Sequence, residues 1–160
     1  MAIKVGDKIP SVTLMHMEES GAKEVSTDEL CKGKKVLLFA VPGAFTPACS
    51  NQHLPGYIQN AEQIKAKGVD TIACISVNDV FVMDAWGKSQ NAADKVLMLA
   101  DGDGEFAKAA GLELDLNGKG LGMRSQRYAM VIEDGLVKEL ELEDGGKLEN
   151  STAEKLLAKL

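Results

Sequence analysis

The 160-residue chain has few of the residues that mark several classes of protein. It contains three cysteines, an odd number in a chain long enough to fold without bridges, so we expect free thiols in a reducing compartment. No apolar run approaches the roughly 20 residues of a membrane span, and residues 1–7 lack the apolar core of a secretory signal. These absences predict a cytoplasmic protein that does not cross a membrane.

An excess of positive charge is also missing. The formal net charge is −6 at pH 7, and the basic residues cluster only at Lys32, Lys34 and Lys35. An acidic chain of this kind is a poor candidate for binding nucleic acid or an anionic membrane surface. The two histidines, His16 and His53, keep no ligand spacing with a cysteine, so no metal is expected.

What the chain does contain is an alternation of strand-like and helix-like segments within one domain, residues 1–160. The strand-like segments are apolar runs at residues 35–41, 69–77, 96–100, 127–133 and 136–142. The helix-like segments are residues 46–67, 78–89, 105–110 and 150–160. Asp134-Gly135 joins the last two strands as a hairpin turn. This order predicts an α/β fold with a central mixed sheet and helices on both faces, and places the chemistry at the carboxyl ends of parallel strands.

The turn after the first of these strands has the features of a reactive thiol site. Thr46 suits a helix N-cap, and Pro47 suits the first helical position. Cys49 then falls at the third helical position, among unpaired N–H groups at the positive end of the helix dipole. That environment lowers the pKa of a thiol, so Cys49 is a candidate nucleophile. The alternative is that Cys49 is a small apolar residue packed under the helix.

Three further features of the sequence bear on the chemistry. No Cys-x-x-Cys occurs, which excludes the dithiol exchange of thioredoxins. Gly102-x-Gly104 after a short strand imitates a dinucleotide fingerprint, but the glycines that follow favour a turn and a helix start. His53 lies one turn after Cys49 on the same helix face and could be mistaken for its base.

The segment Pro42-x-x-x-Thr46-x-x-Cys49 resembles the active-site signature of peroxiredoxins, specifically the type II or peroxiredoxin-5-like subfamily. Similarity continues in the same order through the segments at residues 53–57, 75–86 and 127–135. The resemblance implies a thioredoxin-like fold and thiol-dependent reduction of hydrogen peroxide and organic hydroperoxides, with no cofactor.

The resemblance also implies a role for each matching residue. Cys49 matches the peroxidatic cysteine, which attacks the peroxide and becomes a sulfenic acid. Thr46 matches the hydroxyl that bonds the peroxide and the thiolate, and Pro42 the proline that shields the sulfur from water. Arg127 matches the arginine that holds the sulfur as an anion and polarises the O–O bond. Arg124 is the nearby competitor, and we interpret it as a solvated loop cation.

The route by which the sulfenic acid is reduced stays open at this point. Cys74 matches a second cysteine of plant and many bacterial members and is a candidate resolving residue, but it lies in the middle of a predicted strand. A disulfide needs Cα atoms within about 7 Å, so bridging to Cys49 requires local unfolding. The resemblance favours glutaredoxin with glutathione, or thioredoxin, as external reductant. Cys31 matches no role in the family.

The resemblance also gives expectations for the oligomeric state of the protein and for its role in the cell. In the subfamily, dimers form through the active-site face, and an exposed Phe45 would fit a homodimer of this kind. Phe81 and Trp86 are interpreted as packing or interface residues. A peroxidase that serves redox homeostasis is the favoured function. The alternative is a non-catalytic peroxide sensor or chaperone-like redox protein on the same fold.

Overall fold

The computed structural model describes residues 2–92, 95–144 and 147–160, apart from the side chain of Cys49. Its strands are β1 (Thr13–Glu18), β2 (Gly21–Ser26), β3 (Lys35–Ala40), β4 (Thr71–Ser76), β5 (Leu97–Ala100), β6 (Glu113–Leu116), β7 (Gly122–Ser125), β8 (Tyr128–Glu133) and β9 (Leu136–Leu142). Its helices are α1 (Thr27–Cys31), the π-helix η1 (Cys49–His53), α2 (Leu54–Gln59), α3 (Ala61–Ala66), α4 (Val80–Ser89), α5 (Glu105–Ala109) and α6 (Ala153–Leu157).

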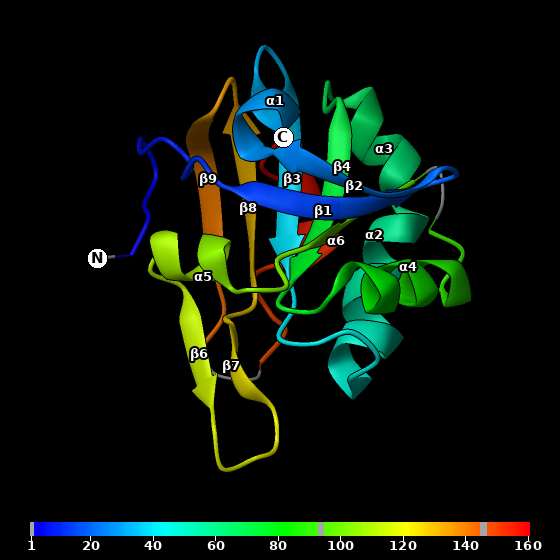
Figure 1. Ribbon diagram of the computed structural model, residues 1–160. Coiled ribbons are helices and arrows are strands. Elements are labelled where there is room, and N and C mark those ends of the chain that lie inside the picture. The colour runs from blue at the N-terminus through cyan, green and yellow to red at the C-terminus, as the bar shows by residue number, and fades with distance from the viewer. Residues whose placement is uncertain (1, 93–94, 145–146) are drawn as a thin grey trace.

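Seven strands form one mixed sheet in the order β2-β1-β5-β4-β3-β8-β9 (Figure 1). Strands β3, β4 and β5 are parallel neighbours, whereas β8 pairs with β3 and β9 in antiparallel fashion. Strands β6 and β7 form a separate antiparallel ribbon. The mixed central sheet is the one predicted from the order of segments.

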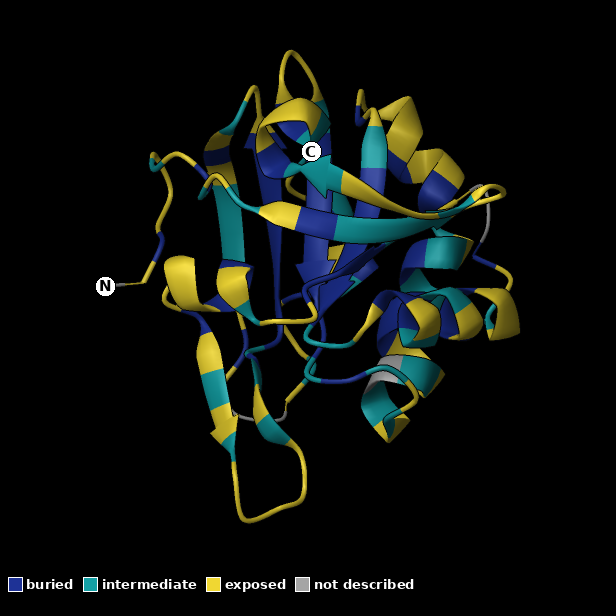
Figure 2. Cartoon of the chain, viewed as in Figure 1, coloured by how far each residue is buried: buried dark blue, intermediate teal, exposed yellow. Residues whose placement is uncertain are grey.

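Alternate residues of the central strands supply two apolar layers, one on each face of the sheet. On one face, Phe39 and Cys74 pack with residues of α2, α3, α4 and α6. On the other face, Leu38 and Ala73 pack with residues of α1, α5 and β1. Figure 1 shows α1 and α5 in front of the sheet and α6 behind it. The central strands are accordingly buried along most of their length (Figure 2).

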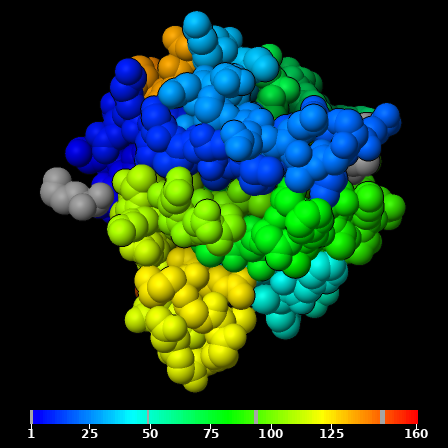
Figure 3. All heavy atoms as spheres, viewed as in Figure 1, coloured from blue at the N-terminus to red at the C-terminus, as the bar shows by residue number. Residues whose placement is uncertain are grey.

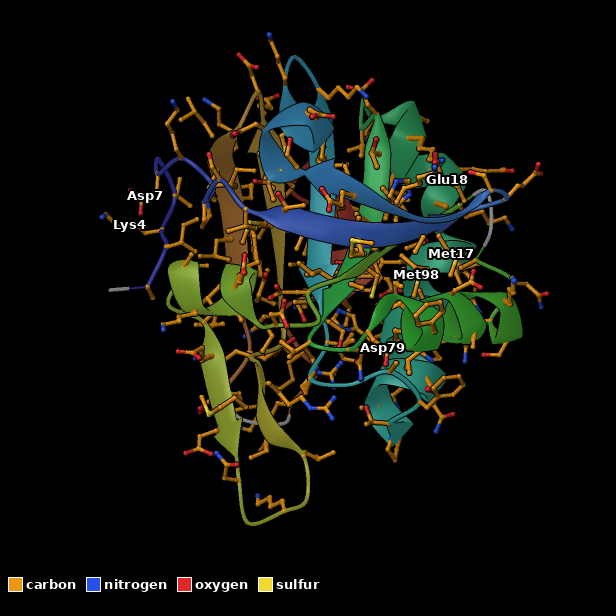
Figure 4. The ribbon with its side chains drawn as sticks, in the orientation of Figure 1. Lys4, Asp7, Met17, Glu18, Asp79 and Met98 are labelled. Atoms are coloured by element: carbon orange, nitrogen blue, oxygen red, sulfur yellow. The ribbon has the colours of Figure 1, made fainter. Side chains whose placement is uncertain are left out.

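Local capping agrees with several predictions from the sequence. The Asp79 carboxylate accepts a hydrogen bond from Val82 N at 2.9 Å, and Asp79 lies at the start of α4 (Figure 4). Gly104 precedes α5 with φ +72°, so the Gly102-x-Gly104 segment is a turn and a helix start, as expected.

No helix in the described part of the chain is long and apolar enough to span a membrane.

The structure differs from the prediction in three segments. The single helix expected over residues 46–67 is divided into Pro47-Ala48, η1, α2 and α3. The hairpin of β1 and β2 was not predicted, because β2 is largely exposed and shows no apolar alternation. The ribbon of β6 and β7 was missed as well, because its glycines were interpreted as breaks. Gly118 and Gly120 have positive φ and lie in its turn, and Gly122, also with positive φ, begins β7.

The β6–β7 ribbon and the segment around residue 50 project from the same end of the molecule in the space-filling view (Figure 3). Strand β3 points toward this end in Figure 1. The carboxyl ends of the parallel strands are therefore where the loops that carry the candidate site meet.

Candidate active site

The loop after β3 is tied to the loop after β4 by hydrogen bonds. Val41 N donates to Ile75 O at 3.1 Å, which continues the β3–β4 pairing beyond the end of the strand. Ala44 N donates to Asn78 Oδ1 at 3.0 Å, and the Ser76 hydroxyl donates to the same oxygen at 2.6 Å. Asn78 was predicted to be part of a helix cap, and its contact with the loop was not foreseen from the sequence.

The turn at residues 42–46 is tight. The Thr46 hydroxyl donates to Gly43 O at 2.7 Å. A Cβ atom added to Gly43 would lie 3.1 Å from both Thr46 Cγ2 and Arg124 Nη1, so this close approach favours glycine. Phe45 has φ +64°, which is a strained backbone conformation for a bulky residue. Strained conformations of this kind occur most often at functional sites in proteins.

The helical segment that follows is a π-helix, η1, rather than the regular helix predicted. Ser50 N donates to Thr46 O at 2.9 Å, and the Ser50 hydroxyl accepts from Trp86 Nε1 at 3.0 Å. The rings of Phe45 and Trp86 lie 6.5 Å apart. Cys49 is the first residue of η1, and its side chain lies outside the described part of the structure. Isolated π-turns occur often at functional sites.

Arg127 and His53 form a buried contact at the end of η1. Their exposed fractions are 3% and 1%, and Arg127 Nη1 lies 2.9 Å from His53 Nδ1. A guanidinium can only donate, so Nδ1 accepts and the ring proton resides on Nε2. Nε2 lies 3.0 Å from Ser151 O, a carbonyl that can only accept. Both contacts therefore specify the same neutral tautomer.

The pKa of His53 agrees with that protonation state. Burial, followed by the positive charge of Arg127, lowers this pKa from 6.5 to about 3, against the opposing effects of Ser151 and Glu143. His53 is thus neutral near pH 7 and is poorly suited to accept a proton from a thiol. The prediction gave it no proton-transfer role, yet it missed that His53 holds the guanidinium of Arg127.

Arg124 also reaches the loop, which corrects the interpretation of it as a solvated loop cation. It is half-buried in β7, and its Nη1 donates to Pro42 O at 3.4 Å while its Nε donates to Leu121 O at 2.7 Å. The structure thus brings Pro42, Thr46 and Arg127 to the end of β3 that carries Cys49, with Arg124 beside them.

The other two cysteines are buried away from solvent. Cys74 lies in β4 with no exposed surface, in register with Phe39 of β3. Cys31 ends α1, and burial together with the nearby charge of Asp28 raises the pKa of its thiol to about 11. Neither environment favours a reactive thiolate.

No group of three His, Cys, Asp or Glu side chains that could hold a metal ion occurs within the described ranges.

Comparisons with known proteins assign the chain to a family. A model of the Redoxin family matches residues 4–157. Peroxiredoxin-2C of Oryza sativa subsp. japonica is 52% identical over 99% of this chain and 98% of its own length. The chloroplastic peroxiredoxin-2E of Arabidopsis thaliana is also 52% identical, over 99% of this chain and 70% of its own length.

Solved structures agree with these relatives. Reduced Prx3 of Vibrio vulnificus in complex with H2O2 has a TM-score of 0.94 and 55% identity, with 98% of each chain covered. Peroxiredoxin 5 of Alvinella pompejana has a TM-score of 0.86 and 40% identity, covering 98% of this chain and 96% of its own. The chain has the thioredoxin-like fold of these proteins. It belongs to the Redoxin family, and within that family it is a type II peroxiredoxin, a thiol peroxidase.

Proposed function

We propose that Cys49 is the peroxidatic residue of this thiol peroxidase. Its thiolate attacks one oxygen of a hydroperoxide, a sulfur–oxygen bond forms, and the O–O bond breaks. The sulfur is oxidised to a sulfenic acid, and the leaving oxygen takes a proton and departs as water or an alcohol. The hydrogen peroxide complex of the Vibrio vulnificus relative supports hydrogen peroxide as a substrate.

The neighbouring residues have separate roles in this step. Arg127 stabilises the thiolate and the negative charge that develops on the leaving oxygen. Thr46 commits its hydroxyl proton to Gly43 O, so its oxygen is available to accept a hydrogen bond from the peroxide. Pro42 shields the sulfur from water.

The observation that carries this proposal is the buried Arg127 guanidinium, held by neutral His53 at the end of the π-helix that Cys49 begins. A charge placed in a site of low dielectric acts strongly on an adjacent thiolate. The test is repeated turnover of hydrogen peroxide with dithiothreitol as reductant, with wild type compared with Cys49→Ser. We expect many turnovers per wild-type chain and none for the variant. Equal consumption by the two proteins would refute the role of Cys49, and consumption of about one peroxide per thiol would indicate a sensor.

The sulfenic acid is reduced by an external thiol, such as glutaredoxin with glutathione or thioredoxin. The burial of Cys74 in the central strand β4 supports this route, because bridging to Cys49 requires that part of the site unfold. We expect Cys74→Ser to keep most turnover with an external thiol. Mass spectrometry after one equivalent of peroxide provides the second test. An oxygen adduct at Cys49 alone agrees with external reduction. A disulfide between Cys49 and Cys74, seen as a mass lower by two hydrogens, contradicts it.

The peroxidase works as a homodimer in the cytoplasm. Exposed apolar side chains near the site, Phe45 and Phe81 among them, support dimerisation through the active-site face. The buried Cys31 and Cys74 suit a reducing compartment. Fractionation of the native cells with an antibody to the chain tests the location, and recovery from an organelle would contradict it.

A further inference from the structure

The carboxylate of Glu143 is buried at the end of β9 and has no part in the chemistry proposed above. It is 4% exposed, and its Oε2 accepts hydrogen bonds from Glu149 N at 2.9 Å, Asn150 N at 2.8 Å and Ser151 N at 2.7 Å. The Ser151 hydroxyl donates to the same oxygen at 2.7 Å. Three successive backbone N–H groups thus converge on one carboxylate oxygen, which fixes the turn that contains Ser151.

This turn supports His53 from the side opposite Arg127. The Ser151 carbonyl lies 3.0 Å from His53 Nε2 and accepts from the Tyr57 hydroxyl at 2.7 Å. The Tyr57 ring stacks on Phe39 of β3 with centroids 4.0 Å apart, so the hydroxyl that shares this carbonyl is itself held by the core. Any shift of the Ser151 peptide group changes the hydrogen bond that keeps the His53 proton on Nε2.

Glu143 is also attached directly to the main chain of Arg127. Its backbone N–H donates to Arg127 O at 3.0 Å, directly after the β8–β9 pairing ends at Tyr128 and Leu142. One residue therefore anchors both the backbone of the arginine and, through Ser151 and His53, its guanidinium. We propose that Glu143 is a positioning residue for the peroxidase reaction, which keeps His53 in its Nε2–H tautomer and thereby holds the Arg127 guanidinium at the thiol.

The ionised state of Glu143 fits this task. Burial alone would raise the pKa of its carboxyl, but the hydrogen bonds from Ser151, Asn150 and Glu149 outweigh burial, and the pKa is lowered. A carboxylate can only accept, and it faces four donors. A glutamine at this position has a weaker acceptor oxygen. Its NH2 group is a donor and cannot accept hydrogen bonds from the same N–H groups.

The inference rests on the role proposed for Arg127 and is tested with Glu143→Gln. Asp144→Asn is the matched control, because it removes the same charge from the next residue, where the side chain is exposed. The rate constant of the reduced protein with hydrogen peroxide is measured without reductant, as a function of pH. Trp86, which bonds Ser50 beside Cys49 and is the only tryptophan, reports the reaction by fluorescence. We expect the Cys49 pKa to rise by about one unit and the rate constant at pH 7 to fall about tenfold in Glu143→Gln, with no change in Asp144→Asn.

The tautomer of His53 provides a readout that loss of packing alone would not give. The chain has two histidines, so ring nitrogen spectra are assigned with His16→Gln. In wild type we expect the proton of His53 on Nε2, and in Glu143→Gln a mixture of both tautomers. This measurement on wild type does not require that the variant fold, and a wild-type proton on Nδ1 would overturn the inference.

The outcomes separate this inference from the proposed function. If Glu143→Gln folds with the wild-type thiol pKa, rate constant and tautomer, Glu143 is not a positioning residue, although the wild-type enzyme remains a peroxidase through Cys49. If wild type shows no catalytic turnover, the proposed function itself fails.

Discussion

At the scale of single residues, the site depends on a histidine that is kept neutral by its surroundings. His53 is enclosed by the core, by Arg127 and by the Ser151 carbonyl. Protonation of its ring would place a second positive charge against the guanidinium and would remove the acceptor at Nδ1. A buried histidine of this kind links the stability of the fold to pH.

We expect the free energy of unfolding to decrease as the pH falls below about 6.5. The pKa of His53 is about 3 in the folded protein, against 6.5 for an unperturbed histidine, so the unfolded chain takes up a proton that the folded chain does not. From this residue alone the loss between pH 6 and pH 5 is about 1.2 kcal/mol. Urea unfolding at pH 7, 6 and 5 measures it. The slope should be smaller in His53→Gln and retained in His16→Gln, and an equal slope in both variants would contradict the assignment.

At the scale of elements, the segment that begins with Cys49 is distinguished by its π-helix, η1. A π-turn contains one more residue than the corresponding α-helical turn, and the exposed residues Asn51 and Gln52 of η1 are where a residue can be removed without loss of core packing. The extra residue sets the angle about the helix axis between Cys49 at the start of η1 and His53 at its end.

Deletion of Asn51 should therefore impair activity while it leaves the secondary structure of the fold nearly unchanged. The shortened segment relaxes toward a regular helix, and the backbone position of Cys49 rotates about the helix axis relative to that of His53. We expect peroxide turnover to fall at least about tenfold while the circular dichroism spectrum stays close to that of wild type. Asn51→Ala, which keeps the length, should retain activity. Full activity of the deletion variant would show that the π-turn is not required.

The start of α5 gives a prediction on stability. Gly104 adopts φ +72°, a conformation that costs an alanine about 1 kcal/mol. We expect Gly104→Ala to lower the free energy of unfolding in urea by about this amount, and Gly104→Asn by less, because asparagine tolerates the left-handed region. Gly102→Ala is the control, because Gly102 has no positive φ and its added Cβ would make only ordinary contacts at 3.7 and 3.8 Å. Equal losses at both positions would exclude backbone strain as the cause.

How far the sequence predicts these elements depends on burial and on sequence separation. The central strands were predicted because apolar runs such as the one in β3 are buried on both faces. The exposed strand β2 and the glycine turn of the β6–β7 ribbon carry no such pattern. The extra residue of η1 leaves no mark in the spacing of apolar residues over so short a segment.

Within the site, the resemblance supplied Pro42, Thr46 and Arg127, and the structure brings them to the end of β3. The contact of His53 with Arg127 joins residues 74 positions apart, and no local pattern encodes it. The same holds for Arg124, whose reach to the Pro42 carbonyl depends on a ribbon that was not predicted.

At the scale of the whole molecule, exposed apolar side chains lie on segments that adjoin the site. Phe45 and Phe81 are 55% and 69% exposed, and Leu121 and Met123 are also exposed. Phe45 contacts Trp86 of α4, the helix in which Phe81 occupies the first turn. Leu121 and Met123 flank the start of β7, from which Arg124 reaches the active-site loop.

Substitution of Phe81 should reduce association between two copies of the chain. We expect sedimentation to give a dimer for wild type and a monomer for Phe81→Glu at micromolar concentration, because a carboxylate would be buried in the interface. Val5→Glu is a suitable control, since Val5 is 55% exposed and belongs to the N-terminal segment. A wild-type monomer, or a dimer that survives Phe81→Glu, would argue against this surface.

The two edges of the large sheet restrict how copies of the protein can associate. Strand β2 presents Lys23 and Glu24 to solvent, and β9 carries Lys138, Glu139 and Glu141. Backbone bonds from Gly6 to Val137 and from Val137 to Asp7 already occupy one end of β9. Charged and covered edges resist strand addition from another molecule, so growth into open-ended β-sheet fibres is disfavoured even at high protein concentration.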